Sequence, residues 1–222
     1  MDKSFDQFGA ETHKYRLNKV LKETEITNFE DEYKVKLPLE YRMFLKHIGN
    51  GGAGPYYGIE KLSNSLYVDL NYKDENEKVN LSEPFPHTKD WNMDFDKFSS
   101  YEEYEKVYFS NEHSNGVLRL CNFGCGVFIS LIVNGEEYGN MWFDDRCNDQ
   151  GIYSASGLNE SERITLLDWY EQWLDKSLAK EKNKNYEKFI SFSLSCKGFR
   201  RIAKILRRSF GMRRRQKFGK LD

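Results

Sequence analysis

The chain has 222 residues, of which 39% are hydrophobic and 15% aromatic, enough to bury a core without disulfides. Its formal net charge of -1 hides two opposite regions. Residues 1–181 hold 20 basic and 33 acidic side chains, a net of -13, whereas residues 182–222 hold 14 and 2, a net of +12. An acidic body with a basic tail bears on the choice of partner and says little about fold.

The sequence has no segment typical of exported or membrane-spanning proteins. Residues 1–16 are polar and charged, so we expect no signal peptide. No apolar run approaches the ~20 residues that cross a bilayer. The four cysteines form no CxxC pair and the chain is too long for a disulfide scaffold, so we expect reduced thiols in a cytoplasmic protein.

Two helices are predicted in the first quarter of the chain. Apolar residues at helical spacing indicate one helix around residues 26–33 and another that starts near Pro38. Gly49 is suited to end the second helix. After a glycine-rich turn at residues 50–54, we expect a short strand in residues 55–62.

The middle of the chain is predicted to contain a strand-rich region. Residues 83–98 alternate proline with aromatic side chains and are expected at the edge of a pocket, and residues 99–112 favour a short helix. Apolar runs at 117–121 and 128–133 predict strands, and Asn134-Gly135 predicts a two-residue type I′ turn into a third strand at 138–143.

A capping box at Asn159 and Glu162 predicts a further helix with a buried face at residues 166–174. Strands in the middle and helices at both ends indicate an α+β fold, with a mixed and mostly antiparallel β-sheet flanked by N-terminal and C-terminal helices. We expect one domain over residues 1–178.

Residues 179–222 are predicted to form a polar linker and a basic amphipathic tail. The tail has four candidate partners or roles: anionic lipid, nucleic acid, the acidic body of the same chain, or a disordered solubilising segment. Its candidate contacts with an anionic surface are Arg200, Arg201, Lys204, Arg207 and Arg208.

No motif in the sequence demands catalysis or a metal. Cys121 and Cys125 lie inside a predicted sheet, where structural packing is the more common role, and the four histidines are scattered. Residues 49–54 lack the Lys-Ser/Thr of a phosphate-binding loop. We therefore expect no catalytic residue, no cofactor, no metal and no small-molecule substrate, and predict that the protein is not an enzyme.

Two groups of residues resemble the pattern of the SUKH superfamily, named in part after fungal cell-wall-synthesis regulators of the Smi/Knr type. The likeness spans residues 11–178. The first group is a helix with a glutamate, a Leu-Pro pair, a Tyr and Phe-Leu helix and a Gly-Gly turn, and the second is a set of glycines before a strand with a tryptophan. The matching residues are Ile26, Glu30, Leu37, Pro38, Tyr41, Phe44, Leu45, Asn50, Gly51, Gly52, Gly124, Gly126, Gly135, Gly139 and Trp142.

This resemblance implies a non-catalytic binding module with an α+β fold. Most bacterial members are similar to immunity proteins of polymorphic toxin systems, which bind and silence a cognate toxin, often a nuclease. An acidic body suits such a partner, because nucleases hold phosphates in basic clefts. A regulatory interaction scaffold, and a protein localised to membrane or nucleic acid by its tail, are the alternatives.

Partner contacts are predicted where acidic and aromatic side chains are expected at the surface. Acidic side chains steer association, and aromatic anchors slow dissociation. The candidates are Tyr56, Tyr57, Trp91, Asp144, Asp145 and Asp149.

Overall fold

The computed structural model describes residues 5–156 and 163–185, the last five of them by their backbone alone. The chain divides into two compact units, one of residues 2–173 and one from residue 174 onward. The candidate contacts of the tail at residues 200–208 and the predicted capping box at residues 159 and 162 lie outside the described residues.

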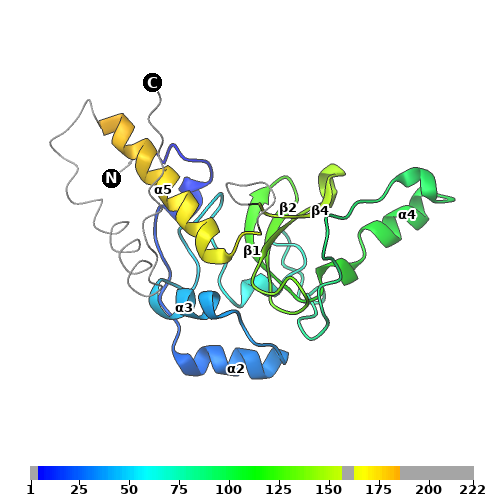
Figure 1. Ribbon diagram of the computed structural model, residues 1–222, viewed down its shortest axis with the longest axis horizontal. Coiled ribbons are helices and arrows are strands. Elements are labelled where there is room, and N and C mark those ends of the chain that lie inside the picture. The colour runs from blue at the N-terminus through cyan, green and yellow to red at the C-terminus, as the bar shows by residue number, and fades with distance from the viewer. Residues whose placement is uncertain (1–4, 157–162, 186–222) are drawn as a thin grey trace. The chain divides into compact units, whose positions relative to one another are not determined.

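The fold is α+β, as the sequence predicts (Figure 1). A four-stranded antiparallel sheet has the strand order β1-β2-β3-β4. The strands are β1 (Val117–Gly124), β2 (Val127–Ile132), β3 (Met141–Asp145) and β4 (Gly151–Ser154). The helices are α1 (Ala10–His13), α2 (Glu23–Tyr33), α3 (Leu39–His47), α4 (Tyr101–Tyr108) and α5 (Leu166–Asn185), with short 3-10 turns η1 (Asn64–Leu66), η2 (Phe95–Lys97), η3 (Asn111–Ser114) and η4 (Arg146–Asn148).

The junction between α2 and α3, which lie side by side in Figure 1, is organised by a buried glutamate. The carboxylate of Glu30 accepts a hydrogen bond from the backbone N–H of Leu37 at 2.8 Å and pairs with Arg42 at 2.6 Å. Burial alone would raise the pKa of Glu30, but the Leu37 hydrogen bond and the Arg42 charge lower it. Pro38 directly precedes α3, and Tyr41 and Phe44 on its inner face are fully buried.

The glycine-rich turn after α3 holds close-packed backbone. Gly51 and Gly52 both have a positive φ, and a Cβ at Gly51 would lie 2.4 Å from the carbonyl oxygen of Ile59. Gly52 pairs with Ile59 through an isolated bridge, so the strand predicted in residues 55–62 is reduced to this bridge.

The cysteine- and glycine-rich stretch forms the turn between β1 and β2. Residues 124–126 all have positive φ, and β1 carries two register shifts before the turn. Gly126 lies against the Sγ atom of Cys147, 2.7 Å from where a Cβ would be. Cys121 is buried, and burial raises the pKa of its thiol, so the prediction that this stretch packs a sheet fits the structure.

The two-residue type I′ turn predicted at Asn134-Gly135 is wrong. β2 ends at Ile132 and β3 starts at Met141, so the connection is a longer loop that contains Gly139 with a positive φ of 89°. Asn134 is used differently, because its side-chain amide donates to the carbonyl oxygens of Leu81 and Ser82. Tertiary hydrogen bonds thus replace the local turn.

The core lies between this sheet and the helices of residues 2–173. Trp142 on β3 is 1% exposed, and its ring packs against that of Phe85 at 5.1 Å. Tyr170 of α5 packs on Phe44 and donates a hydrogen bond to the carbonyl oxygen of Ala53. The capping box at Asn159 predicts a helix that starts at residue 160, but α5 begins only at Leu166. It continues past residue 178 to Asn185.

Candidate partner-binding surface

Six aromatic rings from five parts of the chain gather at one end of the sheet. Phe8 and Tyr57 are 61% and 39% exposed, and the other four are half-buried. We call this set the aromatic surface. It consists of Phe8, Tyr56, Tyr57, Phe123, Phe143 and Tyr153.

Strand register places the inner half of the aromatic surface. Phe143 on β3 is the direct antiparallel partner of Tyr153 on β4, and their rings stack at 5.2 Å. Phe123 at the end of β1 contacts Phe143 at 6.4 Å and Tyr56 at 4.4 Å. The rings are thereby held by the sheet and not by a loose loop.

The outer half comes from two turns. The Phe8 ring contacts that of Tyr57 at 5.2 Å and that of Phe123 at 6.2 Å. Gly9, next to Phe8, has a positive φ, and a Cβ there would lie 2.0 Å from the carbonyl oxygen of Tyr56. This close backbone contact brings the N-terminal segment and the Tyr56-Tyr57 turn together.

The carboxylate of Asp145 borders the aromatic surface. Asp145 accepts a hydrogen bond from the Tyr153 hydroxyl at 3.3 Å, and burial together with the Asp145 charge raises the pKa of Tyr153 to about 12. The predicted Asp149 is exposed in a left-handed conformation after η4 and lies toward α4 instead, because its carbonyl oxygen accepts from the Asn92 side chain and its charge acts on Tyr104 and Tyr108. Tyr153 therefore stays a neutral hydrogen-bonding ring at physiological pH, beside a negative charge.

Asp144 was expected at the surface, and this prediction is wrong. Side chains of a strand alternate between faces, so Asp144 points away from the face that carries Phe143 and Asp145. It is 7% exposed and pairs with Arg119 at 2.5 Å and with Arg146 at 2.7 Å. Burial alone would raise the pKa of Asp144, but the two guanidinium groups hold it well below its ordinary range.

These three residues, the ion cluster, attach the segment around α4 to the sheet. Arg146 also donates to the carbonyl oxygens of Tyr108 and Ser110, and Arg119 donates to the hydroxyl of Ser114. Each of these acceptors lies at the end of α4 or in the residues that follow it. The ion cluster therefore has a structural role.

Trp91 lies away from Tyr56 and Tyr57. Its ring is half-buried and packs on His113 at 4.1 Å, His87 at 5.0 Å and Tyr108 at 5.5 Å. Its backbone N–H and carbonyl pair with those of Ile152 on β4. Among the described residues, then, the aromatic surface includes the predicted Tyr56 and Tyr57 and borders Asp145, whereas Trp91 and Asp144 belong to the packing of the opposite face.

Two histidines, His87 and His113, are in contact beside the ion cluster, and paired histidines can also occur in active sites. Nε2 of His87 lies 3.1 Å from Nδ1 of His113, whose Nε2 lies 3.1 Å from the carbonyl oxygen of Val107. A carbonyl only accepts, so His113 carries its proton on Nε2 and His87 donates to it. Burial, the other histidine and Arg146 lower the pKa of His87 to about 4. Both rings are neutral and engaged with one another, so their contacts serve packing.

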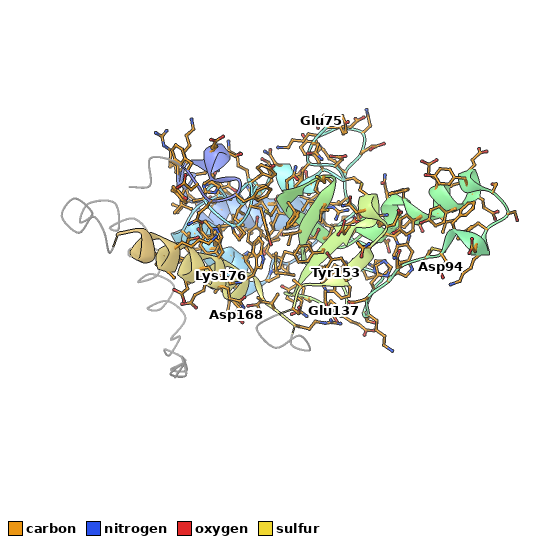
Figure 2. The ribbon with its side chains drawn as sticks, turned by 90° about the horizontal axis from the view of Figure 1, so that it is seen from above. Glu75, Asp94, Glu137, Tyr153, Asp168 and Lys176 are labelled. Carbon is orange, nitrogen blue, oxygen red and sulfur yellow. The ribbon has the colours of Figure 1, made fainter. Side chains whose placement is uncertain are left out.

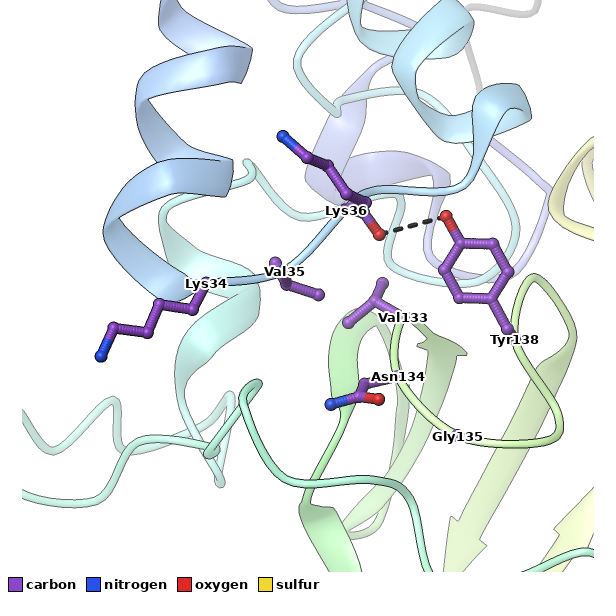
Figure 3. A pocket seen from close by; sticks show the side chains of 7 residues that line it. All are labelled: Lys34, Val35, Lys36, Val133, Asn134, Gly135 and Tyr138. Atoms are coloured by element: carbon purple, nitrogen blue, oxygen red, sulfur yellow. Dashed lines mark hydrogen bonds between the residues drawn. The ribbon is translucent and has the colours of Figure 1, made fainter.

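A shallow pocket of about 310 Å³ lies between the α2–α3 connection and the β2–β3 connection (Figure 3). The Tyr138 hydroxyl in its wall donates a hydrogen bond to the carbonyl oxygen of Lys36 at 3.1 Å, so this donor is already used within the protein. Lys34 and Lys36 contribute to its wall, but their ammonium groups point away from it in Figure 3, and that of Lys36 pairs with Glu30 at 3.4 Å. The lining residues are Lys34, Val35, Lys36, Val133, Asn134, Gly135 and Tyr138.

In the described ranges, no three His, Cys, Asp or Glu side chains come close enough together to hold a metal ion. Every helix of the same ranges is too short or too polar to cross a bilayer. Comparison of the chain with family models, with curated proteins and with solved structures finds no match.

Sequence reasoning missed four of the six rings of the aromatic surface. Phe8 lies in a polar N-terminal segment that gives no sign of a binding surface. Phe123, Phe143 and Tyr153 belong to three different strands, which only the fold brings together. The alternation of Trp142, Phe143, Asp144 and Asp145 along β3 carried the needed information. Trp142 and Asp144 face the core, and Phe143 and Asp145 face the aromatic surface.

Proposed function

We propose that this protein is a non-catalytic binding protein, namely a cytoplasmic immunity protein that binds and neutralises a cognate toxin, with a nuclease as the most specific form of the proposal. One observation carries the proposal: an exposed, sheet-supported group of aromatic rings bordered by the carboxylate of Asp145. Aromatic side chains are enriched at binding hot spots, because a ring buries a large area for little conformational entropy.

Charge supports the choice of a basic partner. Residues 1–181 carry a net of -13, which would speed the encounter with the basic cleft of a nuclease. The resemblance of the motifs around Glu30 and Trp142 to the SUKH pattern points to the same class of protein. The engaged state of His87, His113 and Asp144 supports a role without catalysis.

The test is co-expression with the toxin gene nearest on the chromosome. The wild-type chain should restore growth and copurify with the toxin. The double variant Phe8→Ser/Tyr57→Ser should lose rescue, because it removes the two most exposed rings of the aromatic surface. Tyr72→Ser is the matched control, since Tyr72 is 84% exposed and belongs to another part of the chain.

Two outcomes would count against this proposal. Failure of the wild-type chain to rescue growth with any neighbouring toxin would favour a regulatory interaction scaffold. Salt-dependent retention on heparin, or binding to anionic vesicles, that disappears on deletion of residues 182–222 would favour localisation to nucleic acid or membrane through the basic tail.

A further inference from the structure

A second exposed surface surrounds α4, apart from the aromatic surface. We call residues 93–112 the α4 lobe; it projects beyond the sheet at the right of Figure 1, and Asp94 marks it in Figure 2, well away from Tyr153 on the sheet. Four of its apolar side chains are between 40% and 60% exposed. They are Phe95, Tyr101, Val107 and Phe109.

The α4 lobe is also strongly acidic. It contains six carboxylates and two lysines, a net of -4 within twenty residues. Along α4, Glu102, Glu105 and Phe109 follow i, i+3, i+7 spacing and thus share one outward stripe. Tyr104 and Tyr108 lie on the inner stripe and are buried. Charge and apolar area are therefore mixed on the exposed side of one helix.

The lobe is held firmly enough to act as a preformed surface. The Ser100 hydroxyl caps α4 by accepting from the N–H of Glu103, and the Tyr108 hydroxyl donates to Asn92 at 2.8 Å. The ring of Tyr104 stacks on that of Tyr108 at 4.9 Å. Arg146 fixes the C-terminal end of the helix from the sheet. A fixed surface loses little conformational entropy when a partner binds.

We propose that the α4 lobe is a docking surface for a basic amphipathic segment of a partner protein. Lysine ammonium or arginine guanidinium groups would pair with Glu102, Glu105 and Asp96, and apolar side chains of the same segment would cover Tyr101 and Phe109. Nucleic acid is the wrong occupant, because its phosphates would meet the same carboxylates. This deepens the proposed function, on which it rests, by naming the chemistry of the partner segment.

The test uses the full-length purified chain and a fluorescent synthetic peptide of leucines and lysines arranged as a basic amphipathic helix. Binding is followed by fluorescence anisotropy. The triple variant Asp96→Asn/Glu102→Gln/Glu105→Gln should weaken binding about tenfold, since each exposed ion pair contributes a fraction of that factor. Tyr101→Ser should weaken it by about threefold through lost apolar contact.

The matched control removes the same charge elsewhere. Glu11→Gln/Glu83→Gln/Glu136→Gln changes three exposed carboxylates outside the lobe and should change the dissociation constant less than about twofold. All variants keep residues 182–222, so any effect of that basic segment is constant.

Equal weakening by the two triple variants would overturn the inference, because the peptide would then respond only to net charge. An unchanged affinity of the lobe variant would overturn it as well. Neither result depends on a toxin, whereas loss of rescue in co-expression does, so failure of this inference and failure of the proposed function are distinguishable. A circular dichroism spectrum equal to that of the wild type confirms that each variant folds.

Discussion

A buried carboxylate holds the junction of α2 and α3, and another holds the attachment of the α4 lobe, but the two carboxylates make different contacts. Glu30 satisfies a backbone N–H of Leu37 and shares Arg42 with Glu23, and Arg42 is partly exposed. Asp144 is the counterion of two guanidinium groups that are 3% and 6% exposed. A buried charge without its partner is far more costly than a missing backbone acceptor, so the α4 attachment is the more vulnerable region.

The substitution Asp144→Asn should give the largest loss of stability. It leaves Arg119 and Arg146 without a counterion in a buried site, which costs about 3–5 kcal/mol. Urea denaturation followed by circular dichroism measures the change in unfolding free energy. Asp145→Asn, one residue further and half-buried on the other face, is the control and should cost under about 1 kcal/mol. Equal losses for both would show that the ion cluster is not a structural attachment.

At the other junction, Glu30→Gln should cost less. The amide oxygen still accepts from the N–H of Leu37, while the ion pair with the partly exposed Arg42 is lost, for about 1–2 kcal/mol. Glu30→Ala removes both contacts and should exceed that by about 1 kcal/mol, because the Leu37 N–H is then buried without an acceptor. The same denaturation experiment measures both variants. If the Gln and Ala variants were equally stable, the backbone contact would have no importance at this junction.

The two junctions also differ in how far the sequence predicts them. α2, α3 and α4 follow from apolar spacing, proline and glycine, since these signals act within a few residues. Glu30 and Leu37 are close enough in the chain to belong to one motif. Alternation along β3 places Asp144 on the same face as Trp142, but only strand register brings Arg119 next to it, and no local signal predicts that ion pair.

The same reason explains what was found of the candidate binding site. Tyr56 and Tyr57 stand out as adjacent aromatic residues in a turn, so the sequence alone indicated them. Phe8 and Phe123 become their neighbours through a backbone contact at Gly9 and the end of β1. Trp91 was predicted to be a partner contact but packs on His113. An aromatic residue near prolines is compatible with either an exposed position or an interior stack, and the sequence does not show that His113 lies beside it.

Acid should loosen the α4 attachment before it affects the α2–α3 junction. The pKa of His87 is lowered from 6.5 to about 4 in the folded chain, so between these values the unfolded chain binds the proton and the folded chain does not. Stability from His87 is therefore present above pH 6.5 and lost as the pH falls toward 4. Glu30 has a lowered carboxyl pKa, so its contribution is lost only below about pH 4.5.

Thermal unfolding midpoints measured between pH 7 and pH 4 would show this loss. His87→Gln, whose amide still donates to His113, should have a flatter pH dependence in the window from 6.5 to 4. A variant with the same slope as the wild type would mean that His87 is not the group responsible. Glu30→Gln should leave this slope unchanged and serves as the control.

The smallest effects are expected at two glycines of the sheet turns. Gly126→Ala and Gly139→Ala both place a side chain at positive φ, which costs about 1 kcal/mol, but a Cβ at Gly139 has nothing within 4 Å, whereas one at Gly126 meets Cys147. Rotation of the Cys147 side chain would move only its Sγ atom, and its Cβ would remain 2.9 Å from the new Cβ, so the turn must also shift slightly. Gly126→Ala should therefore exceed Gly139→Ala by about 0.5–1 kcal/mol. Denaturation of the double variant Gly126→Ala/Cys147→Ala measures the part of this crowding that the Cys147 Sγ atom causes. After correction for Cys147→Ala alone, the double variant should lie closer to Gly139→Ala than Gly126→Ala does; an unchanged gap would place the cost in the Cys147 Cβ contact and in the backbone of the β1–β2 turn.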